Sequence, residues 1–579
     1  MAVIGIGDSH DAGCALADKG VVLSALNEER FTKNKNETGF PSNSLRFMLG
    51  RNNDDVQAVA LAWIGGNALV SRISPSWDKN RRKMWRREVP KPSRLGMHFS
   101  NMLYRFSQGQ HPRGAWRAAG NAVGSYVTHK RLGALDPELA KKKVYVVEHH
   151  LAHASAAYYS SGFKEALIVT LDGAGDGLSG TVSIGDNGTI KRLAEFNANT
   201  SLGIMYGAAT LACDMRYSED EGKLMSLAAY SYPSEIKELN DICRYDRGKG
   251  QLVSKTKTRN EFLLAEYMKD HLLGKYNREA FAYAMQSHVE KQVTAIVGHW
   301  ISETNIHNVA LGGGFFSNVI ANMAVERLSG VKNLFVFPHM GDGGLSYGAA
   351  MYVDHMLSGN FSGRQISDLY LGPSYTDAQI EKALKEAKSK GRLEFEHVKD
   401  PATYGAELMA DDNEILLWFQ GSMEYGPRAL GNRSVLSMPD SKENRDKLNL
   451  IIKKRPYYQP FASTILEEDA KKLLSDYTVP NRFMTGANMV RKEHQDYMVA
   501  ASHVDHTTRP QILGKENALY RKLLEKVKKK TGVGAVLNTS LNKHGMPMVL
   551  DPDDAIWTLQ NTGAEVLIIG NYAARKSRK

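Results

Sequence analysis

The pattern of apolar and polar positions near the start of the chain occurs twice. Residues 2–30 hold three short apolar runs separated by a Gly/Asp turn and an Asp-Lys-Gly turn, and residues 166–197 repeat this order. Short apolar runs between such turns predict a three-stranded antiparallel meander. Each copy is followed by mixed helical sequence, so the duplication predicts two lobes of like topology whose first turns can face a shared cleft.

Strand and helix patterns alternate beyond the second copy. The apolar residues of 279–304 recur at helical spacing and predict a long buried helix. Residues 308–311 predict a strand that enters a Gly-rich turn, and a helix begins at 317–318. Residues 333–338 predict another strand, which enters the Gly-rich turn 341–344 before a helix. This alternation predicts an α/β fold.

A stretch containing Ser and Gly at 358–373 predicts a linker. Beyond it, 377–387 has the spacing of an amphipathic helix and 415–419 that of a strand. Because 579 residues are too many for one hydrophobic core, we expect two domains, residues 1–365 and residues 366–579.

Composition narrows the class of protein. Hydrophobic residues make up 42% of the chain and charged residues 24%, which excludes a mainly disordered, collagen-like or coiled-coil protein. No apolar run reaches the roughly 18 residues of a membrane span, and Met1 leads into a strand-like run, so we expect a cytoplasmic protein without a membrane partner. The three cysteines form no CxxC pair, which argues against a disulfide framework or a cysteine zinc site.

The excess of positive charge is concentrated in one segment. The chain carries a net charge of +11, and residues 72–131 alone hold 14 Lys or Arg against only Asp78 and Glu88. Aromatic residues are interleaved with these cations, namely Trp77, Trp85, Tyr104, Phe106 and Trp116. The segment is either a solvated basic helix pair or a surface that attracts polyanions such as nucleic acid.

Two histidines are the first candidates for chemistry. His149 and His153 stand four residues apart in EHHLAHASAAYY, after a strand-like run, so on a helix both imidazoles share one face and can share a metal ion. Asp172 and Asp342, each in a Gly-rich turn at a predicted strand end, supply carboxylates. Such a set suits Fe(II), Zn or Mn. The alternative is a pair of histidines with a capping or core role.

A second candidate is the Gly-rich turn Gly312-Gly313-Gly314, followed by Asn318. It suits either a phosphate or ribose cradle at a helix N-terminus or a tight turn that needs a positive φ. No GxxxxGK[ST] sequence occurs, so it is not a Walker A loop.

The C-terminal half contributes cations and small polar groups beside Gly and Pro turns. These are Arg428, Arg433, Lys453, Lys454, Arg455, Arg509, Asn538, Thr539 and Ser540. Together they can hold a phosphate and a triphosphate, although single arginines of a basic protein are usually surface residues.

Over nearly its whole length the chain resembles the O-carbamoyltransferases of nodulation and antibiotic tailoring. The motifs that carry the resemblance are GDSHDAGCAL, EERFTKNKN, EHHLAHASAAYY, TLDGAGDG, SEDEGKLMSLA, LGGGFFSN, GDGGLSYGAA, EYGPRALGNRS, HVDHTTR and LNTSLNKHGMP.

The resemblance implies a fold and a reaction. The N-terminal domain is expected to be a two-lobed domain of the actin/sugar-kinase (ASKHA) class, with 72–131 as an insertion, and the C-terminal domain a YrdC-like α/β domain. The C-terminal domain would form carbamoyl-adenylate from carbamoyl phosphate and ATP, with Mg²⁺ accompanying ATP. The anhydride would then pass to the N-terminal site, where a substrate hydroxyl attacks it and AMP leaves.

The resemblance also assigns residues. It implies that iron, or another divalent transition metal, is bound by His149, His153, Asp172 and Asp342. It places acceptor-side groups at Asp8, His10 and Lys35, of which His10 is our candidate general base. Nucleotide contacts fall on Gly312, Gly313, Asn318, Glu221 and Lys223. Apart from the resemblance, the residue types of the C-terminal half assign the phosphates of carbamoyl phosphate and ATP to Arg428, Arg433, Lys453, Arg509, Asn538 and Ser540.

The chain departs from the family pattern at Gln459 and His544, where the family commonly has arginine. Two fixed positive charges are thereby lost, so we expect carbamoyl phosphate to bind more weakly than is usual in the family, or in a different arrangement.

The acceptor is not fixed by the fold. We expect a hydroxyl of a sugar or secondary metabolite, and the alternative is a polyanion bound through 72–131, such as hydroxymethylated bases in DNA. Two readings from other classes are an actin-like ATPase or kinase, and a nucleic-acid-binding protein without turnover. The oligomeric state stays open, with a homodimer among the options.

Overall fold

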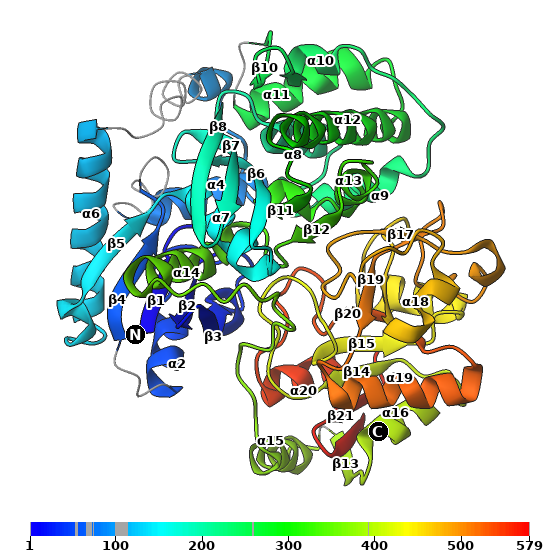
Figure 1. Cartoon of the computed structure of the whole chain (residues 1–579). Coiled ribbons are helices and arrows are strands. Elements are labelled where there is room, and N and C mark those ends of the chain that lie inside the picture. Colours follow the sequence, from blue (N-terminus) through cyan, green and yellow to red (C-terminus); the bar gives the residue numbers. More distant parts are fainter. Residues whose placement is uncertain are drawn as a thin grey trace. The chain divides into compact units, whose positions relative to one another are not determined.

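The computed structural model describes residues 2–51, 56–64, 72, 75–98, 114–256, 260–391 and 393–577. The chain forms two compact units, which Figure 1 shows coloured along the sequence. The first unit comprises Met1–Glu28 and Asn36–Ile366, and the second comprises Glu29–Lys35 and Ser367–Lys579.

The first unit begins with a five-stranded sheet of order β3-β2-β1-β4-β5. Its strands are β1 (Ala2–Gly7), β2 (Gly13–Asp18), β3 (Val21–Asn27), β4 (Val56–Ala62) and β5 (Lys143–Val147). Strands β1, β2 and β3 pair antiparallel, whereas β4 and β5 run parallel to β1.

A second sheet of the same unit repeats this topology in the order β8-β7-β6-β11-β12. Its strands are β6 (Glu165–Gly175), β7 (Leu178–Asp186), β8 (Thr189–Asn197), β11 (Asn308–Gly312) and β12 (Asn333–Val336). Again the first three strands form an antiparallel meander and the last two run parallel to β6. The predicted duplication is confirmed, and the unit has the two-lobed actin/sugar-kinase-like fold.

Two helices pack against each other, one on each sheet. Helix α7 (His149–Ser161) follows β5 in the chain and packs against β6 and β11 of the second sheet, and helix α14 (Leu345–Ser358) lies against both α7 and β1. A Cβ on Gly348 would lie 1.9 Å from the carbonyl oxygen of Ala152, and one on Gly5 would lie 1.9 Å from that of Ser346. The backbones of α14 and α7 therefore approach each other closely at Gly348, and those of α14 and β1 do so at Gly5. The first contact fixes the start of α7 relative to α14.

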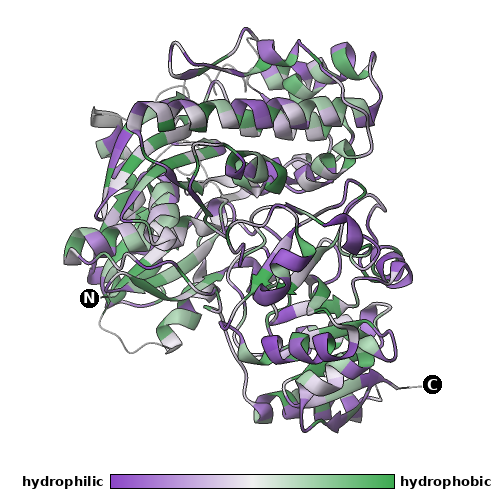
Figure 2. Cartoon of the chain, turned by 45° about the vertical axis from the view of Figure 1, so that its right-hand side comes forward, coloured by the Kyte–Doolittle hydropathy of each residue, from purple (hydrophilic) through white to green (hydrophobic). Residues whose placement is uncertain are grey.

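The remaining helices of the first unit flank the two sheets. They are α2 (Ser42–Arg51), α4 (Pro75–Trp85), α6 (Gly114–Gly133), α8 (Leu202–Ala212), α9 (Glu221–Ala228), α10 (Leu239–Ile242), α11 (Glu261–Met268), α12 (Arg278–Thr304) and α13 (Val319–Glu326), beside the hairpin of β9 (Arg244–Asp246) and β10 (Gln251–Val253). The predicted long helix is confirmed as α12. Figure 2 shows both hydrophobic and hydrophilic residues along it, because only one of its sides is buried.

The second unit is built on a mixed eight-stranded sheet of order β13-β22-β21-β14-β15-β20-β16-β19. The strands are β13 (Leu393–His397), β14 (Leu416–Phe419), β15 (Arg433–Ser437), β16 (Ala462–Leu466), β19 (Pro510–Leu513), β20 (Ala535–Ser540), β21 (Val566–Ile569) and β22 (Tyr572–Lys576). Strands β17 (Asn488–Met489) and β18 (Thr507–Thr508) pair separately. The helices are α1 (Glu29–Thr32), α15 (Asp377–Ser389), α16 (Pro401–Ala410), α17 (Lys442–Lys447), α18 (Glu467–Leu473), α19 (Ala518–Thr531) and α20 (Pro552–Asn561).

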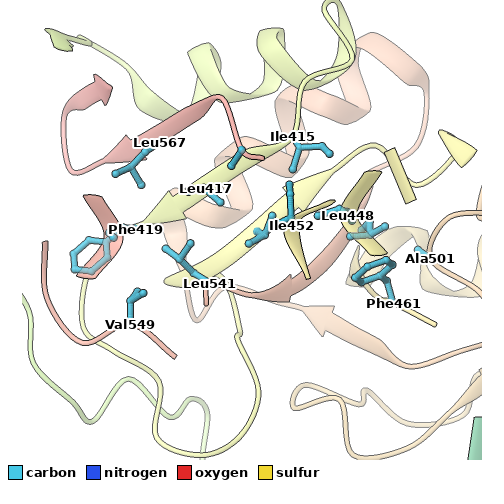
Figure 3. Packing of buried hydrophobic residues seen from close by; sticks show 14 of the residues in the cluster. Ile415, Leu417, Phe419, Leu448, Ile452, Phe461, Ala501, Leu541, Val549 and Leu567 are labelled. Carbon is cyan, nitrogen blue, oxygen red and sulfur yellow. The ribbon is translucent and has the colours of Figure 1, made fainter. Parts of the chain in front are cut away.

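Alternate side chains of the central strands pack into two separate hydrophobic cores. Leu417 and Phe419 of β14 belong to one cluster, which Figure 3 shows together with Leu567 of β21. Leu416 and Trp418 of the same strand belong to the other cluster. Because successive side chains of a strand point to opposite faces, both faces of this sheet are buried.

Residues 29–35 group with the second unit although they follow β3 in sequence. Arg30 donates a hydrogen bond of 2.8 Å to the carbonyl oxygen of Gly426, and Lys33 forms an ion pair with Asp554. Both side chains therefore tie this short segment to the C-terminal half of the chain.

Among the residues that the structure describes, we found no helix with the length and apolar character needed to cross a bilayer.

The Gly348 contact can be tested with paired substitutions. We expect Gly348→Ala to lower the free energy of unfolding by roughly 1–3 kcal/mol, because overpacking would push α14 away from α7. Gly298→Ala is the matched control, since a Cβ at that position in α12 meets no atom within 4 Å and replacing a helical glycine stabilises by about 0.5–1 kcal/mol. Urea unfolding followed by circular dichroism measures both. Equal stability of the two variants would contradict the contact.

Candidate functional site

Four side chains from three parts of the first unit converge. His149 and His153 lie in the first two turns of α7, Asp172 lies in β6, and Asp342 begins a 3₁₀ turn (Asp342–Gly344) ahead of α14. One ligand atom from each lies within 4.8 Å of the others. His149 Nε2 is 3.1 Å from Asp172 Oδ2, and His153 Nε2 is 3.3 Å from Asp342 Oδ1. The structure therefore brings the four predicted ligands together.

Backbone hydrogen bonds explain why these side chains are held in place. The carboxylate of Glu148 accepts from the backbone N–H groups of His150 and Leu151 and so caps α7. Asp176 accepts from the backbone N–H of His149 at 2.9 Å. The backbone N–H of Gly314 donates to Asp172 Oδ1 at 3.0 Å.

Three buried polar atoms at the cluster make no well-formed hydrogen bond among the described residues. They are His149 Nδ1 and the two atoms that face each other at 3.3 Å, His153 Nε2 and Asp342 Oδ1. Burial raises the pKa of Asp342, but the positive charges of His10 and His149 hold it well below its usual range. Burial lowers the pKa of His149, but Asp342 and Asp172 raise it to about 9. Two imidazoles and two carboxylates fit a divalent transition metal ion, which would satisfy these atoms.

His10 lies beside this cluster. Its Nε2 is 3.0 Å from Asp342 Oδ2 and its Nδ1 is 3.3 Å from Asp11 Oδ2. Burial lowers the pKa of His10, but the Asp342 carboxylate overcomes this and raises it to about 10. In this arrangement His10 carries a proton at neutral pH. Its role as a general base therefore stays a prediction, which requires that this proton be displaced.

The other two predicted acceptor-side residues are placed differently. Asp8 is buried, and its carboxylate accepts three hydrogen bonds of 2.9–3.1 Å from Arg72. Lys35 groups with the second unit. Within the described part of the first unit, only His10 of the three reaches the four-residue cluster.

Trp63 is a site residue that the sequence analysis missed. Its ring lies 4.5 Å from that of His149 and 5.3 Å from that of His10. Trp63 has a φ of 83°, which is strained for a bulky residue. Arg72 donates to the carbonyl oxygen of Trp63 at 2.9 Å, so the Asp8–Arg72 pair holds this conformation. No periodicity or motif signals a positive φ at a tryptophan.

The Gly-rich turn lies directly beside the metal-ligand residues. Gly313 has a φ of 100°, and its Cβ would lie 2.2 Å from the carbonyl oxygen of Leu171. A Cβ on Gly312 would lie 2.8 Å from the carbonyl oxygen of His153. Asn318 caps α13 and its Nδ2 donates to Gln286 at 2.9 Å. The tight-turn explanation accounts for these contacts, and nucleotide binding here stays a prediction.

The two further residues assigned to the nucleotide lie at α9. Glu221 is the first residue of that helix, and burial raises its pKa to about 7. Lys223 forms an ion pair of 2.7 Å with Asp220. Both remain candidates for nucleotide contacts.

Three arginines of the second unit form a positive cluster. Burial lowers the pKa of Arg428 to about 10 and that of Arg455 to about 9. Burial and the positive charges of Arg428 and Arg455 lower the pKa of Arg509. The buried Nε atoms of Arg428 and Arg509 have no hydrogen-bond partner among the described residues. The three residues are half-buried, and Arg455 also donates to Asn449 at 2.7 Å, so the unpartnered Nε atoms of Arg428 and Arg509 are the donors that suit an anion.

The other predicted phosphate contacts are engaged within the protein. Arg433 is fully buried, donates to the carbonyl oxygens of Gln420 at 2.5 Å and Pro373 at 3.2 Å, and lies 3.6 Å over the ring of Phe419. Its contacts are those of a structural residue. The structure thus separates Arg433 from the three clustered arginines.

Lys453, Asn538 and Ser540 are likewise hydrogen-bonded. Lys453 donates to Asn542 Oδ1 at 2.7 Å and to the carbonyl oxygen of Ser540. Ser540 donates to Asn542 Oδ1 at 2.8 Å. Asn538 donates to Thr464 at 3.0 Å, while its buried Oδ1 has no partner among the described residues. These bonds hold the loop after β20 in place.

The two departures from the family pattern lie in different surroundings. The carbonyl oxygen of Gln459 accepts from Arg455 at 3.4 Å, and its buried Oε1 has no partner in the described part of the chain. His544 is exposed. The expected weaker binding of carbamoyl phosphate stays a prediction.

The basic segment 72–131 pairs most of its described cations with acidic residues of the first unit. The pairs are Arg72–Asp8, Lys79–Glu37, Arg81–Glu261, Arg86–Glu219, Arg87–Asp214, Lys91–Glu266, Arg94–Glu266 and Arg131–Asp8. Trp85 donates to Glu261 at 2.8 Å and packs on Tyr217. The side chains of Trp77, Tyr104, Phe106 and Trp116 lie outside the described residues. The described charges are thus largely neutralised, which gives the nucleic-acid hypothesis no support.

Comparison with known proteins decides the family. A protein-family model described as "Carbamoyltransferase N-terminus" matches residues 2–351, and a second model, described as "Carbamoyltransferase C-terminus", matches residues 406–576. The chain belongs to the carbamoyltransferase family. The predicted family is confirmed, and so is the prediction that this protein is an enzyme of that class.

Relatives of this carbamoyltransferase span the whole chain or its parts. Uncharacterized protein MJ1051 of Methanocaldococcus jannaschii is 31% identical over 591 residues, 99% of each chain. Nodulation protein NolNO of Sinorhizobium fredii is 30% identical, over 98% of this chain and 79% of that protein. The 3'-hydroxymethylcephem-O-carbamoyltransferase of Amycolatopsis lactamdurans is 29% identical, over 45% of this chain and 47% of that enzyme.

Metal binding by this carbamoyltransferase tests the four-residue cluster. We expect the metal-free protein to bind one equivalent of Co²⁺, used as a spectroscopic substitute for Fe²⁺, with an absorption change that His153→Ala removes. His397→Ala, which changes an exposed histidine of the second unit, is the control and should bind as the wild type does. Unaltered Co²⁺ binding by His153→Ala would contradict the assignment.

Proposed function

We propose that this carbamoyltransferase makes carbamoyl-adenylate from carbamoyl phosphate and ATP and transfers its carbamoyl group to a hydroxyl of a small acceptor. The observation that carries the proposal is the presence of two sites with opposite ligand chemistry in one chain. One is a set of arginines, of which Arg428 and Arg509 have buried Nε atoms without a hydrogen-bond partner among the described residues, and the other is a His–Asp cluster. Phosphate groups suit the first site and a divalent metal ion suits the second.

Adenylate formation is assigned to the second unit. Arg428, Arg455 and Arg509 would bind the phosphates, because buried guanidinium groups bind them strongly. In the first step, water hydrolyses carbamoyl phosphate to carbamate and inorganic phosphate. A carbamate oxygen then attacks the α-phosphorus of ATP, and pyrophosphate leaves, with Mg²⁺ accompanying the nucleotide.

Carbamoyl transfer is assigned to the first unit. The acceptor hydroxyl attacks the carbamoyl carbon, loses its proton, and AMP departs with the bond electrons. His149, His153, Asp172 and Asp342 would hold a divalent transition metal ion, with Fe²⁺ our first candidate, and this ion would neutralise charge on the phosphate of the departing AMP. Trp63 covers His10 and His149 and limits access of water. His10 is our candidate for receiving the hydroxyl proton, because binding of the ion by Asp342 would weaken the contact between Asp342 and His10.

A sugar or secondary metabolite is the acceptor class that we favour. The name of the Amycolatopsis relative specifies a hydroxymethyl group on a small molecule. A DNA acceptor is less well supported, because the described cations of segment 72–131 are paired within the chain. An ATPase or kinase reaction has no observation in its favour beyond the two-lobed fold.

Two substitutions separate the two reactions. We expect Arg428→Gln to abolish carbamoyl-phosphate-dependent exchange between pyrophosphate and ATP, because the phosphates lose a buried cation. His149→Ala should retain this exchange while losing carbamoyl transfer, since it removes only a ligand of the metal ion. Radiolabelled pyrophosphate exchange and mass spectrometry of acceptors measure the two steps.

Arg491→Gln, which changes a cation of the second unit bonded to the carbonyl oxygen of Lys471, serves as the control and should behave as the wild type in both assays. Loss of the exchange reaction in His149→Ala would overturn the division of labour.

A further inference from the structure

A buried arginine beside His10 has no role in the chemistry described so far. Arg82 lies on α4 in the basic segment, is 7% exposed, and points two donor atoms, Nε and Nη2, into buried space. Neither atom has a hydrogen-bond partner among the described residues. Most of the other described cations of this segment have acidic partners. Arg82 therefore differs from its neighbours, because it is buried and two of its donor atoms have no hydrogen-bond partner in the described part of the chain.

The helix that carries Arg82 is anchored to the rest of the first unit. Trp85 donates to Glu261 Oε1 at 2.8 Å, and Arg81 lies 3.3 Å from the same carboxylate. Just beyond the helix, Arg86 pairs with Glu219 at 2.6 Å. These contacts fix α4 on both sides of Arg82 in sequence, so the unpaired guanidinium is held in place.

Contacts of α4 place Arg82 near the turn between β1 and β2. Lys79, three residues before Arg82 on the same helix, lies 3.7 Å from the carboxylate of Glu37, and the backbone carbonyl of Glu37 accepts from the N–H of Ala12 at 2.9 Å. In agreement with this position, burial raises the pKa of Asp11, but its hydrogen bond to His10 and the positive charge of Arg82 lower it below its usual value. His10 turns Nε2 toward Asp342 and Nδ1 toward Asp11, so Asp11 lies at the side of the imidazole away from the four-residue cluster.

Burying a guanidinium without a partner is costly, unless a ligand supplies the missing negative charge. The Nε and Nη2 atoms form one edge of the guanidinium, and two parallel N–H donors on one edge match the two oxygens of a carboxylate or phosphate. A single buried pair of donors suits one anionic group of a small molecule. A DNA backbone would instead need a row of exposed cations.

We propose that Arg82 binds an anionic group, a carboxylate or phosphate, that the acceptor carries near its reactive hydroxyl. This inference rests on the proposed carbamoyl transfer and names the chemical class of its acceptor. The phosphate of the adenylate is assigned to the other side of His10, at the four-residue cluster, so Arg82 is left for the acceptor.

Paired acceptors test the proposal. Each pair is one sugar with and without an anionic group, such as glucose with glucose 6-phosphate and with glucuronate, incubated with the full chain, Fe²⁺, ATP and carbamoyl phosphate. We expect the anionic member to be carbamoylated faster and Arg82→Gln to lower its kcat/KM about tenfold or more, chiefly through KM, with the neutral member unchanged. Arg87→Gln is the matched control, because Arg87 is exposed and pairs with Asp214 only two residues beyond α4.

Two results of this assay would overturn the proposal. Preference of the wild type for the neutral member is one. An equal loss for both members in Arg82→Gln is the other, and it would place the adenylate phosphate at Arg82 instead. If no ATP is consumed in a carbamoyl-phosphate-dependent way, the proposed function fails and the next measurement alone decides the role of Arg82.

Binding of inorganic phosphate gives a readout that is independent of turnover. In calorimetric titrations of an Arg428→Gln background, which weakens the phosphate site of the second unit, we expect a remaining class of phosphate sites that Arg82→Gln removes and Arg87→Gln retains. Equal phosphate binding by the two variants would show that Arg82 is not an anion site.

Discussion

The structure depends on ionisable side chains that it holds close together at two sites. In the first unit, four side chains each place one polar atom within 4.8 Å of the others, namely His149, His153, Asp172 and Asp342. Some buried polar atoms of these side chains make no well-formed hydrogen bond among the described residues. In the second unit, burial lowers the pKa of Arg509, and the positive charges of Arg428 and Arg455 lower it further. Such arrangements are unfavourable alone and become favourable when a cation or an anion binds, so each unit is organised around a ligand of one sign.

Close backbone packing makes the metal-ligand cluster possible. Gly348 lets α14 approach α7, and Gly313 lets the turn after β11 approach β6. These contacts bring His149, at the start of the helix that follows β5 of the first sheet, close to Asp172 of β6 in the second sheet. A duplicated fold thus supplies ligands from two equivalent places, and the glycines set how near they come.

The sequence predicted the features that follow from local pattern. The two meanders, the helix at 279–304 and the grouping of the two histidines come from periodicity, turn residues and i,i+4 spacing, and the structure has all three. Features that depend on tertiary contact could not be predicted. The strained φ of Trp63, the use of Asp8 to hold Arg72, the carbonyl contacts of Arg433 and the grouping of 29–35 with the second unit are of this kind.

The basic segment shows the same limit most clearly. The positive charge of this segment can be read from the sequence, but the acidic partners of its cations lie far away in the chain. Most of the described cations are therefore paired within the protein and do not form a continuous basic surface among the described residues. Arg82 is distinguished from the other arginines only by burial and by the lack of a partner. Neither property can be derived from composition.

The central claim is that one unit activates a carbamoyl group on ATP and the other transfers it. Phosphorus NMR of the full chain incubated with ATP, Mg²⁺ and carbamoyl phosphate tests it most directly. The account predicts AMP, pyrophosphate and inorganic phosphate, formed only when carbamoyl phosphate is present. Formation of ADP, or consumption of ATP that does not depend on carbamoyl phosphate, would contradict it.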